Sequence, residues 1–413
     1  MKNKTNEVSL CEVCGNQNLA SVLNLGQHPM CDDLVAIGDG RVCDEYPIEI
    51  LFCNNCVTAH QRFQVPKHDL FPITYHYRSR FTADVLSGMA GLVNSCEQRF
   101  GSLQAKKILD VGCNDGSLLD VFRAKGSVTI GVEPTGAHRD AALKGHITFN
   151  NFLSQDVADA IVVAHGKPDL ITFTNVFAHI ENLREVVNSL KRLTGPQTVI
   201  IIENHYLGAV LEGNQFDTFY HEHPRTYSHT SFFHIAQSLG LELLDAEFPS
   251  RYGGNIRVFL GNDIKLKNTH AADGTLSARE SKFQQDFSLL RHNVETWRSK
   301  KRNLIQEHVR LYGRLRAKAF PGRAAILVKL LELNEDLIEA VYEKPGSLKI
   351  GHYVPGTRIP IRSDDELFAL VDQGAPILNL AWHISSEIRS YMSMHGYFGE
   401  VIDILSSGDF TLA

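Results

Sequence analysis

The sequence lacks an apolar run long enough to cross a bilayer, and its first residues contain no apolar stretch of the kind that begins a signal peptide. Its longest apolar segments, near 199–202 and 376–382, are far shorter than the roughly 20 residues of a membrane helix. A basic excess is also missing, because 41 lysines and arginines stand against 47 aspartates and glutamates, for a net charge of −6. We therefore expect a cytoplasmic protein that contacts neither a membrane nor nucleic acid.

Short-period repeats and low-complexity tracts are absent as well. The 413 residues, of which 43% are hydrophobic and 21% charged, have the composition of a soluble globular protein. At about 150 residues per domain, this length predicts two or three domains. A chain of this size can bury a sizeable core, so it needs no disulfide bonds to fold.

Four of the eight cysteines form two pairs, Cys11-x2-Cys14 and Cys53-x2-Cys56. In a chain without a secretion signal, such pairs favour metal ligands over disulfides. Four thiolates complete the tetrahedral coordination of Zn²⁺ and leave no position for water, so the predicted site is structural. The alternative is two reduced thiol pairs in a core. The residues between the pairs are rich in turn formers and poor in lysine and arginine, and we place a small zinc module at residues 1–68.

Strand–loop–helix units follow the zinc module. Apolar residues at helical spacing predict a first helix over about 82–99. Helical stretches then separate short apolar strands, which are predicted at 106–112, 127–134, 168–176 and 197–204. Strands joined in this way imply a parallel sheet with crossover helices, and we place this second domain at residues 69–265.

The C-terminal third contains a long proline-free stretch. No proline lies between Pro249 and Pro321, and apolar residues recur at intervals of three, four and seven from Phe283 to Leu311. This pattern predicts a long amphipathic helix, whose basic residues form either a solvated face or an anion-binding surface. The remaining residues alternate between helical and strand-like segments, so we expect a second, smaller α/β domain at 266–413.

A glycine-containing turn follows the first strand of the central domain, in the segment Gly112-Cys113-Asn114-Asp115-Gly116. The next strand ends in Glu133-Pro134, and an acidic residue at this place can accept both ribose hydroxyls of a nucleotide. NAD sites normally show G-x-G-x-x-G, whereas the spacing here is G-x-x-x-G. An acidic Asp115 repels a pyrophosphate but suits a cationic amino-acid cofactor. The pattern favours S-adenosylmethionine over NAD, and a turn without any ligand is the remaining alternative.

Further candidates follow the later strands, because ligands of open parallel sheets bind at the carboxyl ends of the strands. Asn175 and His179 come at the end of the strand predicted at 168–176, although His179 taken alone is better explained as a structural histidine that starts the next helix. The candidate cofactor residues are Asp110, Gly112, Asn114, Asp115, Glu133, Pro134, Asn151, Phe152 and Asn175.

Residues 213–228 are dense in titratable and hydroxyl groups. If this segment is extended, Tyr220 and Glu222 face one way, and His221 and His223 face the other. Histidine is the side chain best poised as a general base near neutral pH, glutamate can orient it, and tyrosine can donate to a developing oxyanion. Acid–base catalysis is the favoured role. A structural loop and a second metal site are alternatives, but near-consecutive side chains converge poorly on one ion.

Together these motifs resemble the sugar C-methyltransferases, which methylate C-3′ of nucleotide-activated deoxysugars. The resemblance covers nearly the whole chain, including the two cysteine pairs and the segments YHYRSR, DVGCNDGSLL, GVEP, TNVFAHI, RYGGNIRVF, HYVPGTRIPI and NLAWHISSEI. Its most diagnostic segment is TFYHEHPRTYS at 218–228, because the cofactor motif alone indicates only a class I methyltransferase.

The resemblance implies a small N-terminal zinc module, a central class I methyltransferase domain with a Rossmann-like sheet, and a C-terminal Rossmann-like α/β domain that helps to hold a nucleotide sugar. It implies that His223 is the general base. The residues it places around this base are Glu222, Tyr220, His179 and one of Tyr75 and Tyr77. One stretch departs from the family, whose C-terminal domain usually opens with a glycine-rich G-Y-G-A turn, whereas residues 319–324 read AFPGRA.

Methyl transfer to carbon requires a carbon nucleophile, and a sugar C–H is acidic only beside a ketone. We therefore expect a TDP- or GDP-linked 4-keto-6-deoxysugar as substrate, an enolate generated by His223, no catalytic metal and a monomeric enzyme. A rival hypothesis is an RNA or protein methyltransferase with a zinc-ribbon recognition unit, which the negative net charge disfavours. A third hypothesis is a non-enzymatic protein that senses the cofactor, but such a sensor has no use for a general base.

Overall fold

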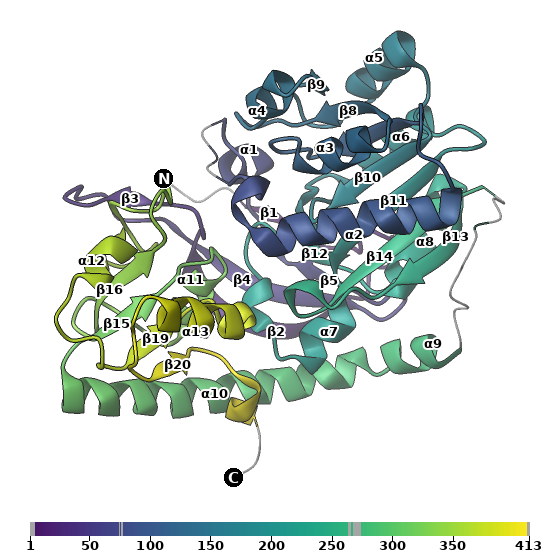
Figure 1. The fold of residues 1–413 in the computed structure, drawn as a ribbon. Coiled ribbons are helices and arrows are strands. Elements are labelled where there is room, and N and C mark those ends of the chain that lie inside the picture. The colour runs from purple at the N-terminus through teal and green to yellow at the C-terminus, as the bar shows by residue number, and fades with distance from the viewer. Residues whose placement is uncertain (1–4, 74, 76, 263–265, 267–273, 411–413) are drawn as a thin grey trace.

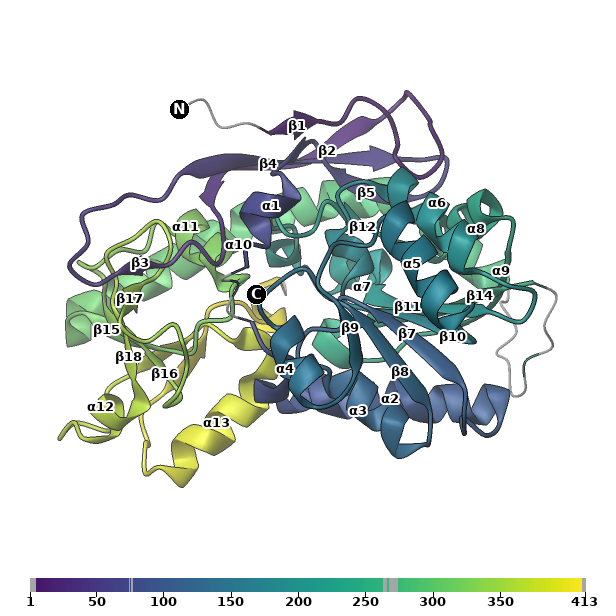
Figure 2. The same cartoon turned by 90° about the horizontal axis from the view of Figure 1, so that it is seen from above.

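The computed structural model describes residues 5–73, 75, 77–262, 266 and 274–410. Two α/β parts lie side by side, and the N-terminal strands extend over both of them (Figures 1 and 2). The predicted boundary at residue 265 lies outside the described residues, so the domain limits at 68 and 265 stay predictions. Within the described ranges, no helix is both long and apolar enough to cross a membrane.

The central domain is built on a seven-stranded sheet. Its order is β9 (Ile147–Phe149), β8 (Val128–Val132), β7 (Lys107–Val111), β10 (Leu170–Thr174), β11 (Val199–His205), β14 (Asn255–Gly261) and β13 (Glu242–Glu247). The first five strands are parallel, as predicted. The last two strands, which were not predicted from the sequence, are antiparallel to their neighbours. The connection from β13 to β14 is too short for a crossover helix, which forces this reversal.

Helices cover both faces of this sheet, because its buried strands place successive apolar side chains on opposite faces. Ile108 packs in the same cluster as α2 (Ala83–Phe100) and α3 (Ser117–Ala124). Leu109, the next residue of β7, packs in the hydrophobic cluster on the opposite face of the sheet. The helices of that second face are α5 (Gln155–His165), α6 (Leu183–Leu193) and α8 (His229–Leu239). Two shorter helices, α4 (His138–Leu143) and α7 (Leu207–Glu212), complete the domain.

The N-terminal part contains two long strands where the sequence predicted mainly turns. Its antiparallel sheet has the order β2 (Ala20–Pro29), β4 (Glu45–Cys53), β5 (Thr58–Gln61) and β12 (Arg225–Thr226). Gly26 fits inside β2 because the register shifts there and its φ of +87° suits glycine. Small elements flank the sheet: β1 (Asn6–Glu7) pairs with β6 (Phe63–Gln64), followed by α1 (Lys67–Leu70).

The C-terminal part is a second Rossmann-like α/β unit, as predicted. Its parallel sheet has the order β18 (Ile361–Ser363), β16 (Ile338–Glu343), β15 (Leu315–Lys318), β19 (Ile377–Asn379) and β20 (Val401–Asp403). Its helices are α11 (Ala324–Leu330), α12 (Asp364–Phe368) and α13 (Ser385–Met394). A small ribbon of β3 (Val35–Ala36) and β17 (His352–Tyr353) ties it to the N-terminal part.

The predicted amphipathic helix is α10 (Phe283–Tyr312), which follows α9 (Gly274–Glu280) and runs beneath all three parts (Figure 1). Its apolar stripe is buried from Phe283 to Ile305, whereas Leu311 is exposed. Phe287 packs against Phe52 of β4 and against Phe219, which directly precedes the predicted catalytic cluster. One helix face therefore joins the zinc module, the catalytic segment and the C-terminal sheet.

Candidate active site

A cavity of about 790 Å³ lies where the carboxyl ends of the two parallel sheets meet. In open α/β sheets ligands bind at this edge, beside the point where the strand order reverses. The central domain contributes the loops after β7, β8, β9 and β10, and the C-terminal domain contributes those after β15, β16 and β19. Both halves therefore present their ligand-binding edges to one shared space.

The cofactor side of the cavity is formed by the turn after β7 and the acidic end of β8. Glu133 is buried and accepts the backbone N–H of Asn114 at 3.0 Å, as well as the N–H and hydroxyl of Thr135. Gly112 has a φ of +73°, and a Cβ there would come within 2.5 Å of the Val176 side chain. The turn therefore requires glycine.

Buried polar atoms without a partner show that this side fits S-adenosylmethionine. Thr174 Oγ1 and Asn175 Oδ1 at the end of β10 are both buried and make no hydrogen bond among the described residues. Such orphaned acceptors are costly unless a ligand supplies a donor, as the ammonium group of S-adenosylmethionine can. Pro134, Asn151 and Phe152 also line the cavity, and their contact with the cofactor stays a prediction.

Asp110 and Asp115 lie outside the cavity lining, behind its wall. Asp115 is fully buried and accepts from the backbone N–H of Arg80 and from the N–H and hydroxyl of Ser117. Asp110 accepts from the Thr172 hydroxyl at 2.7 Å, and burial raises the pKa of its carboxyl to about 7. Their predicted contact with the cofactor stays a prediction, and their visible role is to fix the two ends of the cofactor turn.

Replacing Glu133 tests the cofactor side. We expect Glu133→Gln to weaken S-adenosylhomocysteine binding about tenfold, because a charge-assisted hydrogen bond contributes about 1.5–3 kcal/mol and the amide keeps only part of it. Isothermal titration calorimetry measures the change, with Glu242→Gln on the exposed side of β13 as the matched control. Equal affinities for Glu133→Gln and the control would place the cofactor elsewhere.

The predicted catalytic residues lie in a turn that projects into the cavity. The His223 N–H donates to the Tyr220 carbonyl at 2.9 Å, so the segment is not extended. The alternation expected for an extended segment therefore does not apply, and His223 lies on the same side as Tyr220 and Glu222. Tyr220, Glu222 and His223 line the cavity together, while His221 turns away and its Nε2 donates to the Tyr46 carbonyl at 3.1 Å.

His223 is held in one tautomer by its surroundings. Its Nδ1 lies 2.9 Å from the Thr218 carbonyl oxygen, which can only accept, so Nδ1 carries the proton and Nε2 keeps its lone pair. The ring packs against Tyr220, His179 and His205, with centroids 4.2, 4.8 and 5.5 Å away. Burial and the neighbouring histidines lower the pKa of His223 well below its usual value. The imidazole is therefore neutral at pH 7 and can accept a proton.

The Glu222 carboxyl can act as a proton donor. Its carboxyl is buried, which raises its pKa to about 8, so it is mostly protonated at neutral pH. The Tyr75 hydroxyl donates to its Oε2 at 3.1 Å. His179 Nδ1 donates to the Glu222 backbone carbonyl at 2.6 Å and fixes the turn from the other side. A protonated carboxyl beside a neutral imidazole is an acid–base pair with separated roles.

All six predicted catalytic residues line this one cavity: Tyr75, Tyr77, His179, Tyr220, Glu222 and His223. Tyr75 reaches Glu222, whereas Tyr77 is 43% exposed at the cavity edge. His76, between the two tyrosines, lies outside the described residues.

The sequence analysis missed several cavity residues. His205 ends β11 and His383 follows β19, and the buried Nδ1 of His383 has no hydrogen-bond partner in the part of the chain that the structure describes. Arg323 follows β15, and the loop 343–349 follows β16. These residues all lie at the carboxyl ends of parallel strands. The same position led to the prediction of Asn175 in the central domain.

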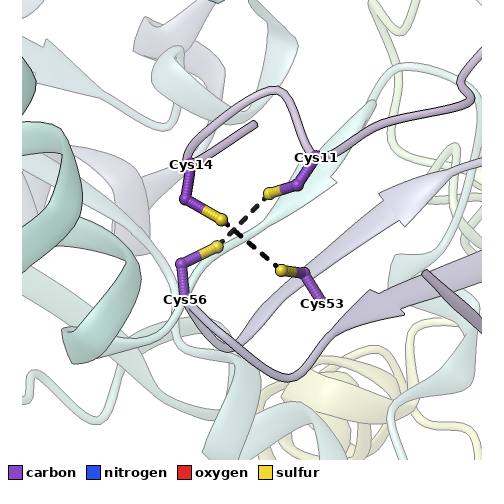
Figure 3. A group of neighbouring side chains, drawn as sticks. All are labelled: Cys11, Cys14, Cys53 and Cys56. Carbon is purple, nitrogen blue, oxygen red and sulfur yellow. Dashed lines mark hydrogen bonds between the residues drawn. The ribbon is translucent and has the colours of Figure 1, made fainter. Parts of the chain in front are cut away.

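The four predicted metal ligands converge in the N-terminal part (Figure 3). Their sulfurs all lie within 4.8 Å of one another, with Cys11 and Cys56 at 3.3 Å and Cys14 and Cys53 at 3.6 Å. Four sulfurs around Zn²⁺ at about 2.3 Å are about 3.8 Å apart, so the set fits a closed tetrahedral site. Among the described residues this is the one cluster with such geometry.

The zinc module holds the catalytic turn directly. Strand β12, which begins two residues after His223, adds to the zinc-module sheet by pairing with β5. The fully buried Arg225 forms an ion pair with Glu12, and Glu12 also faces His60, whose Nε2 lies 3.3 Å from Cys11 Sγ. A continuous set of contacts therefore links the thiolate cluster to the segment that carries the base.

Family models match along most of the chain. A zinc binding domain matches residues 11–71, a methyltransferase domain 76–246, and a C-methyltransferase C-terminal domain 250–401. The chain therefore carries, between residues 11 and 401, three domains that include a C-methyltransferase C-terminal domain. It is a methyltransferase that depends on S-adenosylmethionine and carries a zinc module, which confirms the family, enzyme class, fold class and cofactors predicted from the sequence.

This C-methyltransferase is similar to C-methyltransferase NovU of Streptomyces niveus, with 26% identity over 94% of its own chain and 93% of NovU. A shorter match, 30% identical over 24% of the chain, is to 42% of the ubiquinone biosynthesis O-methyltransferase of Cronobacter sakazakii. Among solved structures, magnesium protoporphyrin IX methyltransferase from Synechocystis with bound S-adenosylmethionine is 13% identical, with a TM-score of 0.31 over 43% of this chain and 78% of that one.

Proposed function

We propose that this enzyme transfers a methyl group to C-3′ of a nucleotide-linked 4-keto-6-deoxysugar. The observation that carries the proposal is the neutral imidazole of His223, which lies in the same cavity as the cofactor turn and has Nε2 as its proton acceptor. A carbon atom attacks a methyl donor only after it has lost a proton, and a base of this kind removes one from a carbon beside a ketone.

In this mechanism the His223 Nε2 takes the C-3′ proton, and the electron pair of the broken C–H bond moves into an enolate with its charge on the C-4′ oxygen. The protonated Glu222 carboxyl or the Tyr220 hydroxyl donates to that oxygen. S-adenosylmethionine, when bound, supplies the electrophilic methyl group that C-3′ accepts. His223 retains the proton until the product leaves.

The expected contribution of each group to the rate enhancement is taken from values typical of enzymes. A placed general base contributes about 10²–10⁴-fold, and stabilisation of an oxyanion contributes about 10²–10³-fold. Alignment of the reacting atoms in a shared cavity supplies much of the rest. No step requires the structural thiolate cluster, which lies in the separate N-terminal part.

The C-terminal half of the cavity supports a nucleotide as the other part of the substrate. Glu343 ends β16 and accepts the backbone N–H of Phe320 at 2.6 Å, just as Glu133 directly follows β8 and accepts that of Asn114. Lys344 and Lys349 follow in the same loop and supply positive charge for a diphosphate. A cavity of about 790 Å³ is near the top of the range of about 300–1,000 Å³ for one ligand and has room for two.

The decisive experiment incubates the enzyme with S-adenosylmethionine and a panel of TDP- and GDP-linked 4-keto-6-deoxysugars. We expect one of these sugars to gain the mass of a methyl group, and NMR to place that group on C-3′. RNA and total protein serve as competing acceptors in the same experiment. Methylation of RNA or protein with none of the sugars modified would favour the rival substrate class and refute this proposal.

A further inference from the structure

Arg323 lies in the turn that departs from the family pattern, and its side chain crosses from the C-terminal domain to the catalytic segment. Its Nε and Nη2 donate to the two carboxylate oxygens of Asp217, at 2.8 and 2.7 Å. Trp382 Nε1 donates to the same carboxylate at 2.9 Å. Asp217 is fully buried and Arg323 nearly so. Three donors from the C-terminal domain therefore fix one carboxylate of the methyltransferase domain.

Asp217 lies in η3 (Phe216–Thr218), and the next residue carries the carbonyl that holds His223. Thr218 accepts from His223 Nδ1 at 2.9 Å, while its own N–H and hydroxyl donate to the Gln215 carbonyl. The other side of this short helix is fixed by Gln215 Nε2, which donates to the Gly253 carbonyl at 2.8 Å. Arg323 is thus separated from the proposed base by two residues of a firmly anchored helix.

We propose that Arg323 is a positioning residue for His223. Through Asp217 it holds η3 so that the Thr218 carbonyl keeps the His223 proton on Nδ1 and leaves Nε2 as the acceptor. The C-terminal domain thereby controls the base as well as contributing to the cavity. The effect on turnover rests on the proposed function, whereas the effect on the imidazole itself does not.

The charges around His223 determine what removal of Arg323 does. The groups that act on the imidazole are His179 of η2 (Phe177–His179), His205 of β11 and Tyr220 of its own turn, which pack against the ring, and Arg323, whose positive charge reaches it. Glu222 lines the same cavity, and Asp217 pairs with Arg323. Neutralising Arg323 removes a positive charge and leaves the Asp217 carboxylate unbalanced. Both changes favour the protonated imidazole, so the pKa of His223 should rise.

The test compares Arg323→Gln, Arg323→Lys and Trp382→Phe with Arg298→Gln, which removes a surface ion pair with Glu332 and serves as control. Histidine ¹³Cε1 is labelled, the His223 signal is assigned by its loss in His223→Gln, and its titration is followed by NMR without substrate. The Lys variant keeps the charge but cannot make two parallel bonds to a carboxylate. The values of kcat and KM are measured in parallel with the methyl acceptor identified from the sugar panel.

We expect Arg323→Gln to raise the titration midpoint of His223 by about one pH unit and to lower kcat about tenfold, with KM for S-adenosylmethionine within twofold. Arg323→Lys should keep the midpoint within about 0.3 unit but still lose kcat several-fold, and Trp382→Phe should lose about threefold. A folded Arg323→Gln enzyme with an unchanged midpoint overturns the proposal, whatever its turnover. If Arg323→Gln does not fold, a Lys variant with wild-type kcat overturns it instead.

Discussion

Replacing His223 by Asn should lower kcat by about 10²–10⁴-fold and leave the affinity for S-adenosylmethionine within twofold. The Asn amide can still donate to the Thr218 carbonyl, so the turn keeps its anchor, but it offers no basic nitrogen in place of Nε2. Because His223 lies in the turn after η3 and not in the loops after β7 and β8, cofactor binding is preserved. Single-turnover kinetics and calorimetric binding of S-adenosylhomocysteine measure the two quantities separately.

His221→Asn is the matched control, because His221 lies in the same turn and faces the zinc module instead of the cavity. We expect its kcat to stay within about fivefold of wild type. If the two variants lose activity equally, the loss reflects damage to the turn and not removal of a base. A His223→Asn enzyme with near-normal turnover would assign proton removal to another residue.

Replacing Cys53 by Ser should remove zinc and reduce activity at least about 100-fold. The loss of one thiolate opens the four-sulfur site at the end of β4, next to the β5 strand that pairs with β12. Zinc binding contributes about 10–16 kcal/mol in isolated zinc modules, so a loss of 5 kcal/mol of stability is a conservative expectation. For a chain of 413 residues this corresponds to a fall in Tm of about 6 °C. Elemental analysis, calorimetry and turnover measure the three effects.

Cys43→Ser controls for the general effect of replacing a buried cysteine, since Cys43 is outside the four-sulfur cluster. It should retain one zinc ion per chain and near-normal activity. A zinc-free Cys53→Ser enzyme with wild-type kcat would show that the catalytic turn does not depend on the module that pairs with it.

The parallel strands of the central domain were predictable because they are short, apolar on both faces and separated by helical stretches. The direction of the last two strands was not, because alternation of apolar residues says nothing about orientation. The long strand β2 was hidden by Gly26 and Pro29, and β4 contains Pro47, since glycine and proline normally indicate turns. Here the glycine lies at a shift in register and Pro29 ends β2.

The site residues were predictable wherever they follow a parallel strand or lie in one dense segment. Their orientation was not, because whether residues 220–223 form a strand or a turn depends on where the chain is anchored. Those anchors come from distant segments: β5 pairs with β12, Glu12 binds Arg225, and Arg323 binds Asp217. Contacts between residues about 100–200 positions apart leave no local signal in a single sequence.

The most direct test of the account is hydrogen exchange into the sugar in D₂O, with S-adenosylhomocysteine replacing the methyl donor. The account predicts that the wild-type enzyme introduces deuterium at C-3′ of the accepted 4-keto sugar, and that His223→Asn abolishes this exchange while His221→Asn preserves it. Exchange at the wild-type rate in His223→Asn would contradict the assignment of the base.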